Sequence, residues 1–237
     1  MNNVNYRNIA DLNSLILRKL SIVPRDFDLV VGLRESGLIP ANLLSLYLNR
    51  PFTDLNSFLN GHIYKAGERG GFFTHNQNQK VLIVDDSLRT GTTLRKAKEK
   101  LAGLTDRFQF SYCVIYIEPG KEAEADLYLE HLTYPHYFQW HLLPDRIRDK
   151  VQFNLNHTPV YTELPEYPFL FAPNLIQAQA VFRKTGRPVL SLADFEMVSS
   201  SETVWKDLRS GKYMPGVRQF GIQLRNTIRR IIKKAKK

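Results

Sequence analysis

Residues 81–93, "VLIVDDSLRTGTT", place four apolar residues directly before two carboxylates, Asp85 and Asp86. An uninterrupted apolar run of this length is typical of a strand that is buried in a parallel sheet. The Thr-Gly-Thr-Thr sequence at 90–93 predicts a turn into a helix. Ligands of parallel sheets bind beyond the carboxyl ends of the strands, and the free N–H groups at a helix start bind phosphate. The stretch therefore predicts a sugar-phosphate site, with carboxylates for ring hydroxyls and amides for the phosphate.

Short apolar segments alternate with helical patterns on both sides of this stretch. The alternation is typical of a parallel sheet whose strands are connected by helices. The patterning weakens further along the chain, so we expect a core domain at 1–145 and a C-terminal extension at 146–237. The extension contains a helical pattern at 173–186 and an apolar segment at 187–192. In the core domain, strands are expected at 28–32, 51–55, 80–86, 108–117 and 126–132, and helices at 11–20, 37–49 and 90–104.

The composition indicates a folded protein that works in a reducing compartment. Of the 237 residues, 43% are hydrophobic, which is enough to bury a core and excludes a wholly disordered chain. The one cysteine, Cys113, excludes an internal disulfide and lies in an apolar segment, where a buried thiol is expected. No apolar run approaches the ~20 residues that cross a membrane. The expected location is therefore the cytoplasm.

Positive charge is concentrated at the C-terminal end. The net charge is +10, and residues 208–237 contain ten Lys or Arg and no Asp or Glu, which leaves 23 basic and 23 acidic residues elsewhere. Apolar residues recur at helical spacing here, so a basic amphipathic helix is expected at 216–237. Such helices bind anionic lipid, and peripheral attachment to the inner face of the cytoplasmic membrane is the first expectation. A helix docked on its own domain, or a solvated charged end, is one alternative, and nucleic-acid binding is a weaker one because basic charge attracts phosphates without specificity.

The thirteen residues of "VLIVDDSLRTGTT" resemble, over their whole length, the signature with which type I phosphoribosyltransferases bind phosphoribosyl pyrophosphate (PRPP). The resemblance implies an α/β fold, with a parallel sheet flanked by helices, and an enzyme that transfers the phosphoribosyl group of PRPP. It also implies Mg²⁺ as cofactor, held mainly through PRPP because no cage of protein oxygens is visible in the sequence. The alternative is an Asp-Asp turn that caps a helix and binds no ligand.

The resemblance assigns the PRPP-binding residues one by one. Asp85 and Asp86 would bind the ribose hydroxyls, and residues 89–93 would hold the 5-phosphate. The segment "VGLRESG" (31–37) stands where the family has its pyrophosphate loop, in which a strained or cis peptide often occurs. The polar loop 60–79 would be a lid whose basic residues reach the pyrophosphate, or alternatively a loop of solvated charge. The implied PRPP-binding set is Arg34, Ser36, Gly37, Lys65, Arg69, Asp85, Asp86, Ser87, Leu88, Arg89, Thr90, Gly91, Thr92 and Thr93.

A closer resemblance implies a glycan as the acceptor. "VVGLRESGLIPANLLSLYLNRPFTDL" and "DLYLEHLTYPHYFQWH" are similar to segments of phosphoribosyltransferases encoded with bacterial surface-polysaccharide genes, and the similarity covers about residues 25–142. It implies transfer of ribofuranose 5-phosphate to a hydroxyl of a lipid-linked glycan of the O-antigen or capsule type. A separate phosphatase of the haloacid-dehalogenase type is the implied partner, because the Asp-x-Asp-Gly motif of such domains is missing here.

The predicted chemistry needs carboxylates beside the sugar ring. Departure of pyrophosphate builds oxocarbenium character at C1, which nearby carboxylates such as Asp85 and Asp86 stabilise. A sugar hydroxyl is a poor nucleophile and gains from a general base, for which Asp85 is the first candidate and Glu35 the second. Tyr137 and Trp140 are the predicted acceptor-binding residues because aromatic rings stack on sugar faces. Packing of these aromatics against the sheet is the alternative.

Two other functions stay open on the sequence. The first is a nucleobase phosphoribosyltransferase, for example one acting on orotate. A purine acceptor is disfavoured, because Arg89 stands where purine phosphoribosyltransferases carry a carboxylate that assists the base, and arginine cannot act as a general base at neutral pH. The second is a regulator on the same fold that senses PRPP without catalysis.

Overall fold

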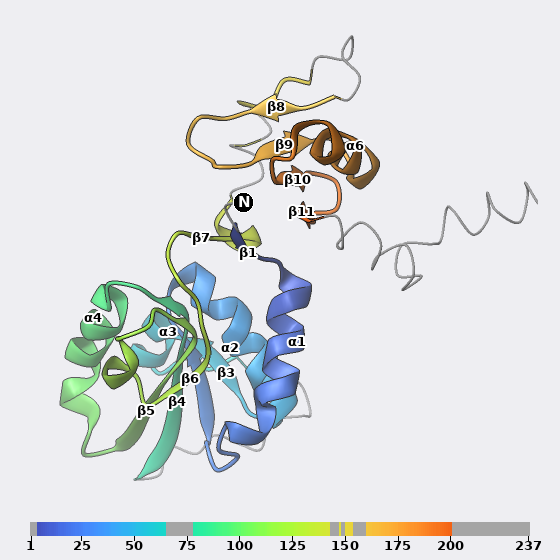
Figure 1. Cartoon of the computed structure of the whole chain (residues 1–237). Helices are drawn as coiled ribbons and strands as arrows, with labels where there is room; N and C mark the ends of the chain where they lie inside the picture. Colours follow the sequence, from blue (N-terminus) through green and yellow to red (C-terminus); the bar gives the residue numbers. More distant parts are fainter. Residues whose placement is uncertain (1–3, 65–77, 143–146, 148–149, 154–159, 201–237) are drawn as a thin grey trace, which may run out of the picture. The chain divides into compact units, whose positions relative to one another are not determined.

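The computed structural model of the chain describes residues 4–64, 78–142, 147, 150–153 and 160–200 (Figure 1). The chain divides into two compact units, one formed by Val4–Ile147 and the other by Arg148–Lys237 with Met1–Asn3. The domain boundary expected at 145/146 falls within 143–146, outside the described residues. Each unit has its own sheet and is described by itself.

The first unit is built on a five-stranded parallel sheet with the strand order β3-β2-β4-β5-β6. All its neighbouring strands pair in parallel, as the alternating sequence pattern predicted. The central strand β4 carries the apolar run 81–84 and the two acids Asp85 and Asp86. The strands are β2 (Leu29–Gly32), β3 (Phe52–Asp54), β4 (Gln79–Leu88), β5 (Phe108–Ile117) and β6 (Leu127–His131).

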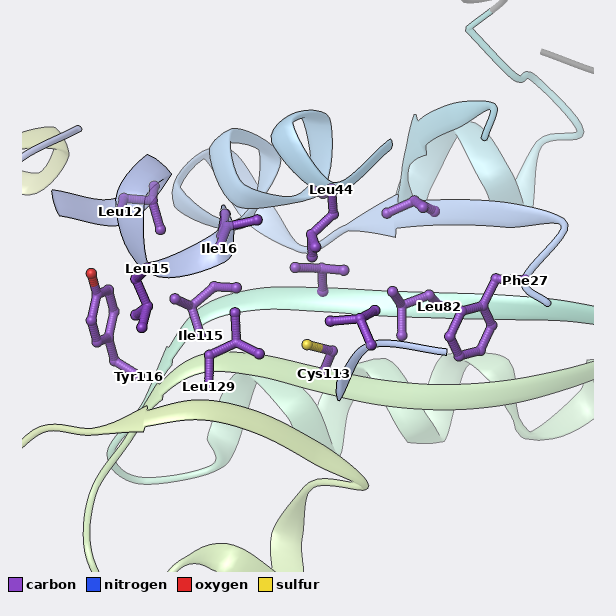
Figure 2. Close-up of a cluster of buried hydrophobic side chains, with 14 of the residues drawn as sticks. Leu12, Leu15, Ile16, Phe27, Leu44, Leu82, Cys113, Ile115, Tyr116 and Leu129 are labelled. Carbon is purple, nitrogen blue, oxygen red and sulfur yellow. The ribbon is translucent and has the colours of Figure 1, made fainter. Parts of the chain in front are cut away.

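Helices cover both faces of this sheet, so the predicted α/β fold is confirmed. On one face, α1 (Ile9–Lys19) and α2 (Arg34–Leu48) bury an apolar stripe against the strands. Figure 2 shows side chains of the two helices pointing toward the sheet, where the predicted buried thiol of Cys113 lies. The opposite face is covered by α3 (Leu55–Leu59) and α4 (Thr92–Leu101), and Figure 1 shows α1 and α4 on opposite sides of the sheet. The short 3₁₀ turns are η1 (Leu20–Ile22), η3 (Ala102–Leu104) and η4 (Glu122–Glu124).

Two boundaries near the predicted site differ from expectation. The helix expected from residue 37 begins at Arg34, and the Gly37 N–H donates to the Leu33 carbonyl at 3.0 Å, so most of the expected loop is the first helical turn. The strand expected to end at Asp86 continues to Leu88, because β5 runs beside it to the same level. β2 stops earlier, with Gly32 opposite Val84. The two acids therefore lie within β4 but beyond the end of β2.

A second, two-stranded sheet fixes the segment that follows β6. β1 (Asn5–Arg7) pairs in parallel with β7 (His136–Phe138), and η5 (Gln139–His141) follows directly. The Asn5 side chain donates to the Thr133 carbonyl at 2.8 Å, and the Ile9 backbone N–H donates to Gln139 Oε1 at 3.0 Å. The N-terminal residues thus hold the aromatic segment 134–141 within the first unit.

The second unit contains a small mixed sheet with the order β11-β10-β9-β8. β9 and β10 are parallel and are connected by α6, whose buried residues Ala178 and Val181 pack on the sheet. The helix and strand expected at 173–186 and 187–192 are present as α6 and β10. Its elements are β8 (Thr162–Glu163), β9 (Leu170–Ala172), α6 (Leu175–Thr185), β10 (Val189–Ser191) and β11 (Met197–Val198).

The basic amphipathic helix expected at 216–237 lies outside the described residues. Among the helices of the part that the structure describes, none is both long and apolar enough to cross a membrane.

The Tyr116 hydroxyl gives a test of the core. It is buried and has no hydrogen-bond partner among the described residues. Tyr116→Phe is therefore expected to leave the free energy of unfolding unchanged, or to raise it by up to about 1–2 kcal/mol, because an unsatisfied polar group is removed. Urea unfolding of the purified protein measures the change.

The matched control is Tyr47→Phe, because the Tyr47 hydroxyl donates a hydrogen bond to Asn13 Oδ1. This variant is expected to lose about 0.5–1.5 kcal/mol of unfolding free energy. A loss from Tyr116→Phe as large as that from Tyr47→Phe would contradict the assignment of an unpartnered hydroxyl.

Candidate functional site

The two acids of β4 are buried and face different surroundings. Asp85 is 5% exposed and Asp86 is 3% exposed. Successive side chains of a strand point to opposite faces, so two neighbouring acids inside β4 cannot both point the same way. Asp85 Oδ1 accepts the backbone N–H of Asp86 at 3.0 Å, whereas the Asp86 carboxylate contacts the segment that follows β7.

Two side chains of η5 meet the Asp86 carboxylate. Trp140 Nε1 donates to Asp86 Oδ2 at 2.7 Å, and His141 Nε2 lies 3.0 Å from the same oxygen. Ser36, in the first turn of α2, also favours the charged form of this carboxylate. Burial by itself raises the pKa of Asp86, but the hydrogen bonds from His141, Trp140 and Ser36 outweigh burial and lower it. Asp86 is therefore the charged member of the pair.

Asp85 is the member that keeps a proton to higher pH. Its burial raises its pKa, and the neighbouring charge of Asp86 raises it further, to about 8. Arg34 acts in the opposite direction but more weakly. Because two adjacent buried carboxylates repel each other when both are ionised, the site splits their protonation states.

A pocket of about 290 Å³ opens on the Asp85 side of the pair. The turn 89–93 forms much of its wall, and Gly91 adopts a φ of 69° there, at the start of α4. The positive φ favours glycine here, and a Cβ would also displace the end of the Glu124 side chain, whose Oε2 lies 1.8 Å from the Cβ position. The pocket is lined by Asp85, Ser87, Leu88, Arg89, Thr90, Gly91, Thr92, Thr93, Leu94, Tyr134, His136 and His141.

A second pocket, of about 360 Å³, shares Thr90, Thr92 and Thr93 with the first. Arg34 lies at its edge with a φ of 54°, a backbone conformation that costs a non-glycine residue free energy. Its Nη1 donates to Thr93 Oγ1 at 3.3 Å, which ties the start of α2 to the start of α4. Three cationic side chains and no acidic one line this pocket, whose residues are Leu33, Arg34, Leu55, Thr90, Thr92, Thr93, Lys96, Ala97 and Lys100.

Four residues of the first pocket were not among the predicted site residues: Leu94, Tyr134, His136 and His141. The Arg89 guanidinium lies 4.6 Å from the centre of the Tyr134 ring, in a cation–π contact. Burial lowers the pKa of His136, and the charge of Arg89 lowers it further, so the imidazole is neutral at neutral pH. The sequence signal that could have identified His136 is the period-2 alternation of β7. It places His136 and Phe138 on one face of the strand and Tyr137 on the other.

The structure brings most of the predicted binding residues to these two pockets. Arg34 and residues 89–93 line one or both, and Ser36 and Gly37 lie beside the acid pair. Glu35 is exposed and lines neither pocket, and Tyr137 is also not among the lining residues. Trp140 stacks on Phe138 and contacts Asp86. Lys65 and Arg69 lie outside the described residues.

Within the described part of the chain, no three His, Cys, Asp or Glu side chains converge as a protein-held metal site requires.

Comparisons with known proteins agree with this arrangement. A family model described as "Phosphoribosyl transferase domain" matches residues 4–124, which include both acids and the turn 89–93. Xanthine-guanine phosphoribosyltransferase of Chromohalobacter salexigens is 27% identical over 123 residues, which are 50% of this chain and 70% of that protein.

Two solved structures are among those similar to the chain. The purine phosphoribosyltransferase from Pyrococcus horikoshii Ot3 has a TM-score of 0.40 and 22% identity, over 57% of this chain and 92% of that one. The Helicobacter pylori xanthine-guanine-hypoxanthine phosphoribosyltransferase has a TM-score of 0.45 and 11% identity, over 61% and 99% of the two chains.

Gly37 gives a steric test of the acid pair. A Cβ at this position would lie 2.9 Å from the Val84 carbonyl oxygen and 3.1 Å from Asp85 Oδ1. Gly37→Ala is therefore expected to push α2 away from β4 and to lower the free energy of unfolding by about 1–3 kcal/mol. The control is Gly103→Ala, where a Cβ meets nothing within 4 Å and no loss is expected. Equal stability of the two variants in urea would refute the close contact.

The raised pKa of Asp85 predicts a pH dependence of stability. Its pKa is about 8 in the folded protein, against an ordinary value of 3.8. Stability that comes from protonated Asp85 is thus fully present below pH ~4 and is lost as the pH rises toward 8. We expect the unfolding free energy of wild type minus that of Asp85→Asn to fall from pH 5 to pH 8, because only wild type loses the stability that protonated Asp85 provides. A difference that is constant with pH would contradict the raised pKa.

Proposed function

The chain belongs to the phosphoribosyl transferase domain family, and from that premise we propose that it transfers the phosphoribosyl group of PRPP to a ring nitrogen of a nucleobase. The observation that carries the proposal is the pocket beside Asp85. The turn 89–93 lines it with backbone and hydroxyl groups suited to a phosphate, and Tyr134, His136 and His141 line it with rings that can stack on a base or hydrogen-bond to it. The pocket volume of about 290 Å³ is at the lower end of the range for small-molecule sites, which is roughly 300–1,000 Å³.

The proposal assigns the donor to the acid pair and the two turns around it. The ribose hydroxyls bind the carboxylates of Asp85 and Asp86, and the 5-phosphate binds the N–H groups and hydroxyls of residues 89–93 at the start of α4. The pyrophosphate lies toward the second pocket, where Arg34, Lys96 and Lys100 supply positive charge. Mg²⁺ would be held mainly by the pyrophosphate oxygens, and it would neutralise charge on the leaving group.

The transfer breaks one bond and forms another at C1 of the ribose. Pyrophosphate leaves with the electron pair of the C1–O bond, and the lone pair of the base nitrogen forms the new C1–N bond on the opposite face. The proton of that nitrogen passes to Asp85 in its ionised form. A pKa near the working pH suits a general base, and burial with the Asp86 charge raises the pKa of Asp85 toward that range. Glu35, exposed at the start of α2, receives no support for this role.

The acceptor we propose is a base that is negatively charged near neutral pH, such as orotate or xanthine. Xanthine is a purine, which the sequence disfavoured because Arg89 cannot act as a base; the proposal includes it because Asp85 is assigned that role here. Arg89 carries a permanent charge in the pocket, where His136 and His141 add imidazole rings. The named activity of the Chromohalobacter relative supports a nucleobase over a glycan. Transfer to a glycan, the partner phosphatase and membrane attachment receive no support from the comparisons.

The test is incubation of the full-length protein with PRPP, Mg²⁺ and a panel of single acceptors. The panel contains orotate, xanthine, guanine, hypoxanthine, adenine and uracil, together with lipid-linked glycans. Product masses and pyrophosphate release are measured. We expect a nucleotide with orotate or xanthine, and none with adenine, which offers Arg89 no negative charge.

Asp85→Asn is the matched variant for this assay. It is expected to bind PRPP and to lose about 10²-fold or more in turnover, because the proton acceptor is removed. Ribose phosphate added to a glycan and to no base would overturn the proposed acceptor. Wild-type turnover by Asp85→Asn would overturn the assignment of the base.

A further inference from the structure

We propose that Trp140 and His141 are positioning residues, which hold the Asp86 carboxylate in the orientation that receives the ribose of PRPP. The inference rests on the proposed function in one respect, namely that PRPP is the donor. It does not depend on which acceptor is used. It assigns two residues that act through Asp86 instead of touching the reacting atoms.

The contacts on Asp86 are concentrated on one oxygen of its carboxylate. Trp140 Nε1 at 2.7 Å and His141 Nε2 at 3.0 Å both lie at Oδ2. A carboxylate offers about four acceptor positions, two on each oxygen. With both positions of Oδ2 occupied, the carboxylate is held in one orientation, and Oδ1 is the oxygen that can receive a ribose hydroxyl.

Trp140 is itself held rigidly, which a positioning role requires. Its ring stacks on Phe138 with the ring centres 4.7 Å apart and 7° between the planes. Phe138 is fully buried and stacks in turn on Tyr116, with the centres 5.2 Å apart. β7 pairs with β1, and Gln139 accepts the Ile9 N–H. The stacking therefore holds the Trp140 side chain in one rotamer, in which the indole N–H donates to Asp86.

His141 connects this support to the pocket. Its side chain is 46% exposed, so it is not part of the packed core, yet it lines the pocket beside Asp85 and contacts Asp86. Both residues lie in η5, outside residues 4–124 that match the family model. The donor-binding acid is thus oriented by a segment that also forms the rim of the pocket.

The test measures PRPP binding by calorimetry in the presence of Mg²⁺ and without any acceptor. Trp140→Phe removes the N–H and keeps a ring against Phe138, and we expect it to raise the dissociation constant about tenfold, the size typical of a hydrogen bond to a charged group. His141→Leu and His141→Gln introduce side chains of similar size, but only glutamine keeps a hydrogen-bond donor. A positioning role predicts weaker binding for the leucine variant and near wild-type binding for the glutamine variant.

Tyr116→Phe is the control for the aromatic stack. It changes one polar atom of the same stack and none of the contacts of Asp86, so its dissociation constant should equal that of wild type. Thermal unfolding of each variant shows whether the fold is intact. If Trp140→Phe does not fold, the His141 pair still decides the question.

Three results would overturn the inference. They are equal PRPP binding by wild type, Trp140→Phe and His141→Leu; equally weak binding by the leucine and glutamine variants of His141; and weak binding by Tyr116→Phe. Failure of the wild-type protein to bind PRPP would remove the proposed function as well. Normal PRPP binding with no product from any base would remove only the proposed acceptor, so the two failures are distinguishable.

Discussion

The pairing of β4 with β5 past the end of β2 is the constraint on which the site depends. β2 stops opposite Val84, and the hydrogen-bonded ladder between β4 and β5 continues to Leu88. The strand therefore carries Asp85 and Asp86 beyond the end of β2, with Asp85 opposite Val114 of β5 and the Asp86 N–H bonded to the Asp85 side chain. The space beside them, where β2 is missing, is filled by the first turn of α2 and bounded by the start of α4. Gly37 is needed there because α2 approaches within contact of Asp85.

Placing two acids at this position creates an electrostatic problem that the surroundings resolve. Burial of two charged carboxylates side by side is unfavourable, because each loses hydration and repels the other. Trp140, His141 and Ser36 favour the charged form of Asp86, and Asp85 avoids a second buried charge by keeping its proton to higher pH. The difference in environment gives two chemically identical residues different roles. One is a fixed anion, and the other can exchange a proton near neutral pH.

The site draws on parts of the chain that are distant in sequence. The turn 89–93 follows directly from β4, but the groups that surround it come from the start of α2 and from the segment 134–141. That segment is anchored by N-terminal residues through the β1–β7 pairing. Donor binding and the rim of the pocket are consequently joined through Asp86 and η5. Under the proposed function, a change in the aromatic segment would alter the contacts of an acid assigned to the donor, although the two are more than fifty residues apart.

The sequence by itself determined the local elements and the motif. Apolar runs and helical spacing were enough for the parallel sheet, for the helices that became α1 and α4, and for the strand, turn and helix that carry Asp85 to Thr93. These follow from interactions between near neighbours in the chain, which periodicity records. Only the tertiary structure decided that the two acids face different surroundings, and that Trp140 contacts Asp86 while His136 and His141 line the pocket. Strand order and the extra length of β4 and β5 create those contacts, and no local pattern encodes which distant residue will meet a given side chain.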